Sequence, residues 1–212
     1  MEGAISLPEH GAEIQMTLSY HFMSHDYVKG GSPGLELVNQ QVLLATTGRG
    51  VLGPPSGQRG FPDYPEPPHF RLNRKLGRDL RDLEQYGEYW LVSAKLKDLL
   101  EAMAPQACAF CPCLTSLVDD SPGPEYFLCD VLQVLDSVDE TRSKVTVKYT
   151  KSGRKTYQMS GLVSLVFNLE VTHDHHLFRP AYLTQEVICD DELKRACKAA
   201  SLKGIKFRET EP

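Results

Sequence analysis

Three cysteines and a histidine-rich turn are the residues of this chain best suited to bind a metal ion. Cys108, Cys111 and Cys113 lie close together, and residues 173–176 read His-Asp-His-His. Thiolates and imidazoles in a tetrahedral arrangement are the ligands that zinc prefers. The cysteines, however, lack the second Cys-x-x-Cys pair that makes such a site specific, and the histidines follow roughly sixty residues later. We therefore predict no metal.

Free cysteine is among the most buried residue types, so packing in the core is the better explanation for most of the thiols. This prediction covers Cys108, Cys129, Cys189 and Cys197.

A glycine motif at residues 48–53 reads Gly-Arg-Gly-Val-Leu-Gly and matches the pattern G-x-G-x-x-G. In dinucleotide-binding proteins a helix begins at these glycines, and its N-terminus faces the pyrophosphate. Here Pro54, Pro55, Ser56 and Gly57 follow, and they cannot continue as that helix. We predict that the chain binds no nucleotide cofactor.

The residues needed for nucleophilic catalysis are present, but no arrangement of them is specific. No Gly-x-Ser-x-Gly elbow occurs, and the paired acids at 119–120, 139–140 and 190–192 fit two turns and a helix cap. The chain is therefore predicted not to be an enzyme. The alternative is a small hydrolase or effector enzyme that uses His173, His175 and His176.

Acidic turns and tyrosines offer a face for binding another protein. Acids steer a basic partner toward a surface, and aromatic side chains anchor it. The residues predicted to contact a partner are Asp119, Asp120, Glu125, Asp136, Asp139, Glu140, Tyr64 and Tyr86. For any one of them, an ordinary solvated loop is the simpler interpretation.

Two similar strand-helix-strand units position these turns. In the first, the run 89–92 precedes Ser93 as helix N-cap, and apolar residues at 96, 99, 100 and 103 form one helix face before the strand at 108–111. In the second, the run 187–189 precedes Asp190 as N-cap, Lys203 and Gly204 close the helix, and a strand follows at 205–208. The units align without a gap, although any amphipathic helix of standard length could align in this way.

The segment between the two units is rich in strand patterns. Strands are predicted at 126–135, at 144–149, in a hairpin through 151–154 into 156–159, and at 162–169, with two short ones at 14–22 and 40–46. The predicted fold is α+β, with a mostly antiparallel central sheet and two amphipathic helices in similar strand-helix-strand units.

Glycine and proline divide the chain near residue 70. Eleven of the 21 residues from 48 to 68 are glycine or proline, which predicts an extended surface loop or arm. We expect a loop-rich N-terminal region at 1–69 and an α+β domain at 70–212, together forming one continuous unit.

Composition excludes several partners. The chain has 212 residues and a net charge of −5, so no global field favours nucleic acid or an anionic membrane, and a basic protein partner fits better. Its first residues lack a signal sequence, and no apolar run approaches the roughly 18 residues of a membrane span. With only six cysteines, the chain is expected in the reducing cytoplasm.

Four stretches of the chain resemble a known bacterial family. They are residues 67–84 leading to Tyr-Trp-Leu-Val-Ser at 89–93, Phe-Leu-Cys-Asp-Val at 127–131, His-Leu-Phe-Arg at 176–179, and Ile-Cys-Asp at 188–190 through Phe207. They are similar to the immunity-protein family numbered eleven among the antidotes of polymorphic toxin systems, the myxobacterial-type immunity domain. The resemblance spans roughly residues 67–208.

This resemblance implies a non-enzymatic cytoplasmic antidote that binds a cognate toxin, in a system such as type VI secretion, and blocks its active site or substrate access. The toxins of such systems are often nucleases with basic grooves, so the implied partner is a basic protein. A regulatory interaction module unrelated to toxins is a further alternative, and a toxin gene directly upstream would argue against it.

Overall fold

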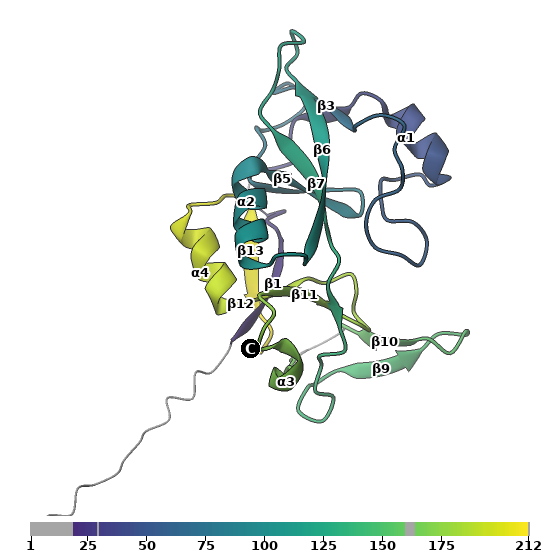
Figure 1. Cartoon of the computed structure of the whole chain (residues 1–212), viewed down its shortest axis with the longest axis vertical. Helices are drawn as coiled ribbons and strands as arrows, with labels where there is room; N and C mark the ends of the chain where they lie inside the picture. Colours follow the sequence, from purple (N-terminus) through teal and green to yellow (C-terminus); the bar gives the residue numbers. More distant parts are fainter. Residues whose placement is uncertain (1–18, 29, 160–163, 212) are drawn as a thin grey trace, which may run out of the picture.

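A computed structural model describes residues 19–28, 30–159 and 164–211. The larger of its two long sheets occupies the upper part of the molecule in Figure 1. Its strands, in spatial order, are β2 (Leu35–Leu37), β3 (His69–Leu72), β6 (Cys108–Ser116), β7 (Tyr126–Val131), β5 (Tyr89–Ser93) and β4 (Leu83–Tyr86). β3 and β6 pair in parallel and the other neighbours are antiparallel, so this sheet is mixed.

The second long sheet lies below the first and combines strands from both ends of the chain (Figure 1). Its order is β13 (Ile205–Glu209), β1 (Tyr20–His25), β12 (Ile188–Asp190), β11 (Leu177–Pro180) and β8 (Val134–Leu135). β11 and β8 are parallel, so this sheet is mixed as well. A separate hairpin joins β9 (Thr146–Tyr149) to β10 (Lys155–Gln158), as predicted.

Four helices occur in the described residues, rather than the two that were predicted. They are α1 (Gln40–Thr47), α2 (Ala94–Met103), α3 (Leu169–Thr172) and α4 (Asp191–Ala199). The fold is α+β, but three sheets of which two are mixed replace the single, mostly antiparallel central sheet of the prediction.

The two strand-helix-strand units are confirmed as β5-α2-β6 and β12-α4-β13, and α2 lies against α4 (Figure 1). Both predicted N-caps form. The Ser93 hydroxyl accepts a hydrogen bond from the Leu96 amide at 3.3 Å, and the Asp190 carboxylate accepts one from the Leu193 amide at 2.9 Å. Each cap satisfies a backbone donor that the first helical turn would otherwise leave free.

Replacing Ser93 with alanine should lower the free energy of unfolding by about 1 kcal/mol, the usual cost of losing an N-cap. The hydroxyl also donates to the Asp82 carboxylate at 2.7 Å, so the substitution removes a contact between the start of α2 and the bend directly before β4 as well. Urea denaturation of the two proteins measures the difference. A Ser152→Ala variant in the β9–β10 turn is the control, since among the described residues that hydroxyl forms its one hydrogen bond with Thr150, at 2.9 Å.

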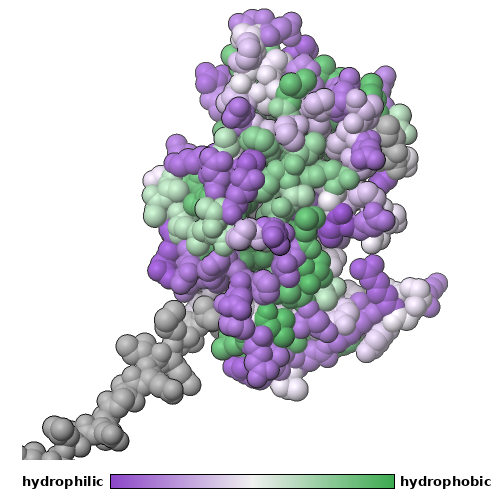
Figure 2. All heavy atoms as spheres, viewed as in Figure 1, coloured by the Kyte–Doolittle hydropathy of each residue, from purple (hydrophilic) through white to green (hydrophobic). Residues whose placement is uncertain are grey.

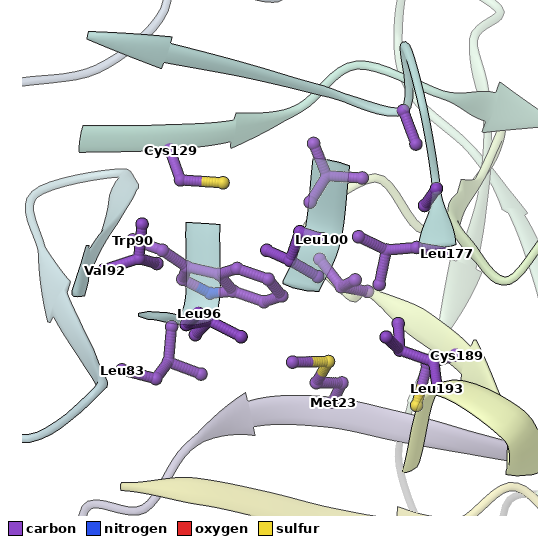
Figure 3. Close-up of a cluster of buried hydrophobic side chains, with 14 of the residues drawn as sticks. Met23, Leu83, Trp90, Val92, Leu96, Leu100, Cys129, Leu177, Cys189 and Leu193 are labelled. Carbon is purple, nitrogen blue, oxygen red and sulfur yellow. The ribbon is translucent and has the colours of Figure 1, made fainter. Parts of the chain in front are cut away.

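The principal core lies where the two sheets meet, and side chains from both sheets and both long helices fill it (Figure 3). Trp90 from β5, Leu100 from α2, Met23 from β1 and Leu193 from α4 are all buried there. One face of each sheet is thus covered by the other sheet and by the α2–α4 pair, while residues on the opposite faces pack in two further clusters.

The cysteine prediction is largely confirmed. Cys129, Cys189 and Cys197 are buried in this core, and the partly exposed Cys108 packs against it.

Several predicted elements are wrong. The segment 40–46 is helix α1 instead of a strand: Leu43 is fully buried while Val42 is exposed, and Gly48 ends the helix with a φ of 62°. Of the predicted strand 162–169, residues 162 and 163 lie outside the described residues, and the described part makes isolated bridges at Ser164 and Phe167 before α3 begins at Leu169. Of the strand at 14–22, β1 begins at Tyr20, and residues 14–18 lie outside the described residues.

The predicted strand 126–135 is divided between the two sheets. The amides of Leu132 and Gln133 both donate to the Ala107 carbonyl, at 2.7 and 3.3 Å, so the chain turns there. Residues before the turn form β7 of the six-stranded sheet and residues after it form β8 of the other. A uniform apolar pattern cannot reveal such a turn.

Helix α4 ends earlier than predicted. Its last residue is Ala199, and Ser201 takes the left-handed conformation with a φ of 54°. Gly204 lies in the following turn with a φ of 83°, where an added Cβ would lie 2.6 Å from the Leu83 carbonyl oxygen. Glycine is therefore required at 204 by a close approach of two backbones rather than by the helix end.

Residues from before position 70 take part in both long sheets, because β1 and β2 pair with strands from later in the chain. The division of the chain at residues 69 and 70 stays a prediction.

Candidate functional site

The acids predicted to contact a partner lie in two separate loops. Asp119, Asp120 and Glu125 belong to the β6–β7 connection at the top of Figure 1, whereas Asp136, Asp139 and Glu140 follow β8 near the β9–β10 hairpin. The two loops lie at opposite ends of the longest axis of the molecule, so the structure does not bring the six acids together.

The acids of the β6–β7 connection shape its turn. Asp119 accepts hydrogen bonds from the Ser121 hydroxyl at 2.6 Å and the Ser121 amide at 3.1 Å, which hold the pKa of this carboxyl below its ordinary value. Asp120 pairs with Arg71 of β3 at 3.0 Å. Both remain exposed, so they are fixed in place and still available to a partner.

The second acidic loop is held in a similar way. Asp139 accepts bonds from the Thr141 hydroxyl and two backbone amides, and Glu140 pairs with Lys155 and accepts the Tyr157 hydroxyl at 2.6 Å. These contacts lower the pKa of both carboxyls. Asp136 accepts the Tyr182 hydroxyl at 3.3 Å.

Tyr64 and Tyr86 are half-buried and pack against a second apolar cluster around the buried Tyr89 and Phe70. The ring of Tyr86 lies 4.9 Å from that of Phe70, edge to face. Burial also raises the pKa of Tyr64 to about 12. Much of the surface of each ring is thus used in contacts within the protein.

A groove of about 870 Å³ beside the β6–β7 connection is a site that the sequence analysis missed, apart from Asp119. Most of its lining is apolar, contributed by Leu72, Leu80, Leu117, Val118, Pro124 and Tyr126. Charged side chains line it too, among them Arg74 and Asp79, which form an ion pair at 2.6 Å. An apolar groove with charged residues around it is typical of a protein-binding site.

The β6–β7 connection also exposes more apolar surface than a solvated turn would. Leu117 and Val118 are 40% and 59% exposed, Leu114 near the end of β6 is 56% exposed, and Leu76 from the facing loop is 57% exposed. Further apolar surface lies over β6 and β7 beside α2 in Figure 2. The run Leu117-Val118 directly before two aspartates was the signal in the sequence that could have revealed this site.

Two glycines hold the far wall of the groove in place. An added Cβ at Gly77 would lie 2.3 Å from the Ser32 carbonyl oxygen, and one at Gly34 would lie 2.4 Å from that of Asn73. The two backbones are joined by the Gly34 amide, which donates to the Arg78 carbonyl at 2.7 Å. The groove is therefore built on close backbone packing that only glycine permits.

The cysteines of β6 do not gather around one point. Cys108 packs against the principal core, whereas Cys111 and Cys113 pack against the second cluster on the opposite face of the sheet. Burial raises the pKa of Cys113 to about 12, which disfavours the thiolate form that a metal would need.

The histidine turn is held by local contacts. His173 lies 3.1 Å from the Leu169 carbonyl and 3.0 Å from Asp174, and His176 lies 2.7 Å from the Asp190 carboxylate. Among the described residues, the side chains of His173, His175 and His176 form no hydrogen bond with a serine, threonine or cysteine side chain.

Within the part of the chain that the structure describes, His176, Asp190 and Glu192 form one group close enough to share a metal ion. Asp190, however, already caps α4 and bonds His176. The positive end of the α4 dipole also disfavours a cation at this point. We assign these residues to holding the helix in place.

None of the helices in the described residues is long and apolar enough to cross a membrane. A comparison with curated proteins gave no match. The model of one protein family, described as the Immunity protein family (Imm11), matches residues 20–211. Because this match covers nearly the whole chain, including the β1, β2 and α1 region ahead of residue 67, the chain belongs to the Imm11 immunity protein family.

Proposed function

We propose that this protein is a non-enzymatic immunity protein that binds a cognate toxin and blocks its active site or substrate access. Membership of the immunity family supports the existence of a toxin partner. The observation that carries the binding mode is the groove beside the β6–β7 connection, with Leu117 and Val118 exposed at its edge. A few residues near the centre of an interface, where water is excluded, supply most of its binding energy.

We propose further that the toxin is basic, with a nuclease as the class of toxin tested first. Asp119, Asp120 and Glu125 place negative charge beside the exposed apolar residues, on a groove that Arg74 and Lys75 also line, and the whole chain carries −5. Such a surface attracts a basic active-site groove and occupies the positions in it where nucleic-acid phosphates would otherwise bind. Expression in the cytoplasm of a bacterium that uses type VI secretion is part of this proposal.

Replacing Val118 with aspartate should weaken toxin binding by more than about tenfold, because a charge would enter the apolar centre of the interface. The side chain is 59% exposed, so the folded protein should remain as stable as before. Isothermal titration with the purified toxin domain encoded by the adjacent gene measures the affinity.

The matched control is Leu169→Asp, which places the same charge on an exposed apolar residue at the first turn of α3, at the other end of the molecule. This control should bind as the wild type does. Equal losses from the two variants would place the interface elsewhere, and no loss from Val118→Asp would exclude the groove.

Co-expression tests the function itself. Cells that produce the toxin of the adjacent gene should survive when this protein is also produced, and they should die when the Val118→Asp variant replaces it. Survival should be restored without any turnover of a substrate by the immunity protein. Failure of the wild-type protein to protect would refute the antidote function for this pair.

A further inference from the structure

The end of the chain carries positive charge that the net charge conceals. Residues 194–208 contain six basic side chains and no acid, although the whole chain has a net charge of −5. The six are Lys194, Arg195, Lys198, Lys203, Lys206 and Arg208. They belong to α4, to the following turn and to β13, so this basic segment is one continuous region of the fold.

A groove of about 570 Å³ lies between α4 and β13. Lys194 and Lys198 line it from the helix, and Lys206 lines it from the strand. Half-buried Ile205 and Phe207 add apolar surface between these charges. The other residues that line it are His21, Asp26, Val28 and Glu209.

Part of the basic charge is already used within the protein. Lys194 Nζ lies 3.5 Å from Asp191 and 3.1 Å from His21, and Lys206 Nζ lies 4.8 Å from the Tyr27 ring centre. Arg195 and Lys198, by contrast, are exposed and form no ion pair with any residue that the structure describes. These two cations are available to a partner.

β13 is an edge strand. It pairs with β1 on one side, and no other described strand pairs with it on the other. The free edge offers backbone donors and acceptors that an extended segment can use by adding one more strand. The side chains of such a segment would alternate between the two faces of the sheet, and those on the α4 face would meet the part of the groove that Lys198 lines.

We infer that α4 and β13 form a second binding surface, which takes an acidic, extended segment of a partner protein. The segment pairs with β13 and places a carboxylate against Lys198, which lines the groove, while its apolar side chains contact Ile205 and Phe207. Arg195 does not line the groove, and it adds positive charge from the exposed side of α4. An acidic polypeptide fits better than nucleic acid, because the net charge of −5 repels a long polyanion while a short segment interacts with the local charge. This surface is separate from the β6–β7 groove and does not depend on the function proposed for it.

Fluorescence anisotropy with the full-length protein tests this inference. The probe is a short fluorescein-labelled peptide of alternating glutamate and valine, compared with the same peptide in which glutamine replaces glutamate. The acidic peptide should bind and the neutral peptide should not. The double variant Arg195→Glu/Lys198→Glu should weaken binding of the acidic peptide by about tenfold or more.

The matched control is Lys148→Glu/Lys151→Glu, which makes the same charge change on two exposed lysines of the β9–β10 hairpin. It should change the affinity less than about twofold, as expected for charges far from the site. Equal losses from both double variants would show non-specific attraction and refute the site, as would the absence of binding by the wild type. Tighter binding of an oligothymidylate of equal charge would refute the polypeptide and favour nucleic acid.

Discussion

Replacing Asp130 with asparagine is expected to lower the free energy of unfolding by about 3–5 kcal/mol, the usual result of breaking a buried ion pair. Asp130 of β7 is fully buried and receives the Arg59 guanidinium, the Gly60 amide at 2.7 Å and, at 3.6 Å, the Arg179 guanidinium of β11. Burial, together with the nearby Arg59, lowers the pKa of Arg179 to about 10. Without the carboxylate, the buried Arg179 and the partly exposed Arg59 would face each other without a compensating charge.

Urea denaturation of the purified proteins measures this loss, and Asp136→Asn is the control. Asp136 is exposed and accepts one hydrogen bond, so its substitution should change the free energy of unfolding by less than about 0.5 kcal/mol. Adding Arg59→Gln to Asp130→Asn should recover part of the loss, because one uncompensated charge is removed. Near-additive effects of the two substitutions would contradict the proposed coupling.

This network also explains why the glycine- and proline-rich segment is not a free arm. Arg59 and Gly60 anchor the segment to Asp130, the Tyr89 hydroxyl donates to the Gly60 carbonyl at 2.8 Å, and Leu52 is buried. Of the predicted extended surface loop or arm at residues 48–68, the loop is confirmed, because the segment holds no strand or helix after Gly48, but the free surface position is wrong. Its attachment to the core depends on a partner 71 residues further along the chain, which local composition cannot reveal.

Local signals predicted the elements that depend on local physics. The N-caps Ser93 and Asp190 and the helix faces that follow them could be predicted, because a cap and a periodic apolar face act within a few residues. The sheet to which each strand belongs could not be predicted from such local signals. β7 and β8 have the same apolar character, and only the turn at Leu132 sends them to different sheets.

In the candidate site, too, local features could be predicted from the sequence and long-range contacts could not. The acidic turns could be found in the sequence, because aspartate before serine or threonine is a turn signal. The positions of these turns at opposite ends of the molecule could not be found in the sequence, because they depend on how the two long sheets pack. The groove needs residues from two loops, among them Leu80 and Val118, which become neighbours only after β3 and β6 have paired.

Replacing Glu84 with glutamine should also cost about 3–5 kcal/mol, and the loss should depend on pH. Glu84 of β4 is almost fully buried between the Arg78 and Arg81 guanidiniums, with Arg78 Nη2 at 2.8 Å and Arg81 Nε at 3.2 Å. Burial raises the pKa of this carboxyl, but the hydrogen bonds from the two arginines outweigh that effect and the net pKa lies below the ordinary value of 4.5.

A carboxyl whose pKa is lower in the folded than in the unfolded protein stabilises the fold above its unfolded pKa, and this contribution is lost as the pH falls through the folded value. The difference between the wild type and Glu84→Gln should therefore be full at pH 7 and should shrink progressively below about pH 4.5. Urea denaturation across this pH range measures it. A difference that is constant with pH would show that the loss comes from altered packing rather than from the charge.

The control for this prediction is Asp79→Asn. This substitution removes the carboxylate of an exposed arginine–carboxylate pair, Arg74 and Asp79, whose hydrogen bonds have similar geometry. Asp79 contacts Arg74 at 2.6 and 2.7 Å, yet the two side chains are 64% and 84% exposed. Water screens this pair and competes for its hydrogen bonds, so the variant should unfold close to the wild type at every pH. The contrast would show that burial, and not the number of hydrogen bonds, decides how much an arginine–carboxylate pair contributes to this fold.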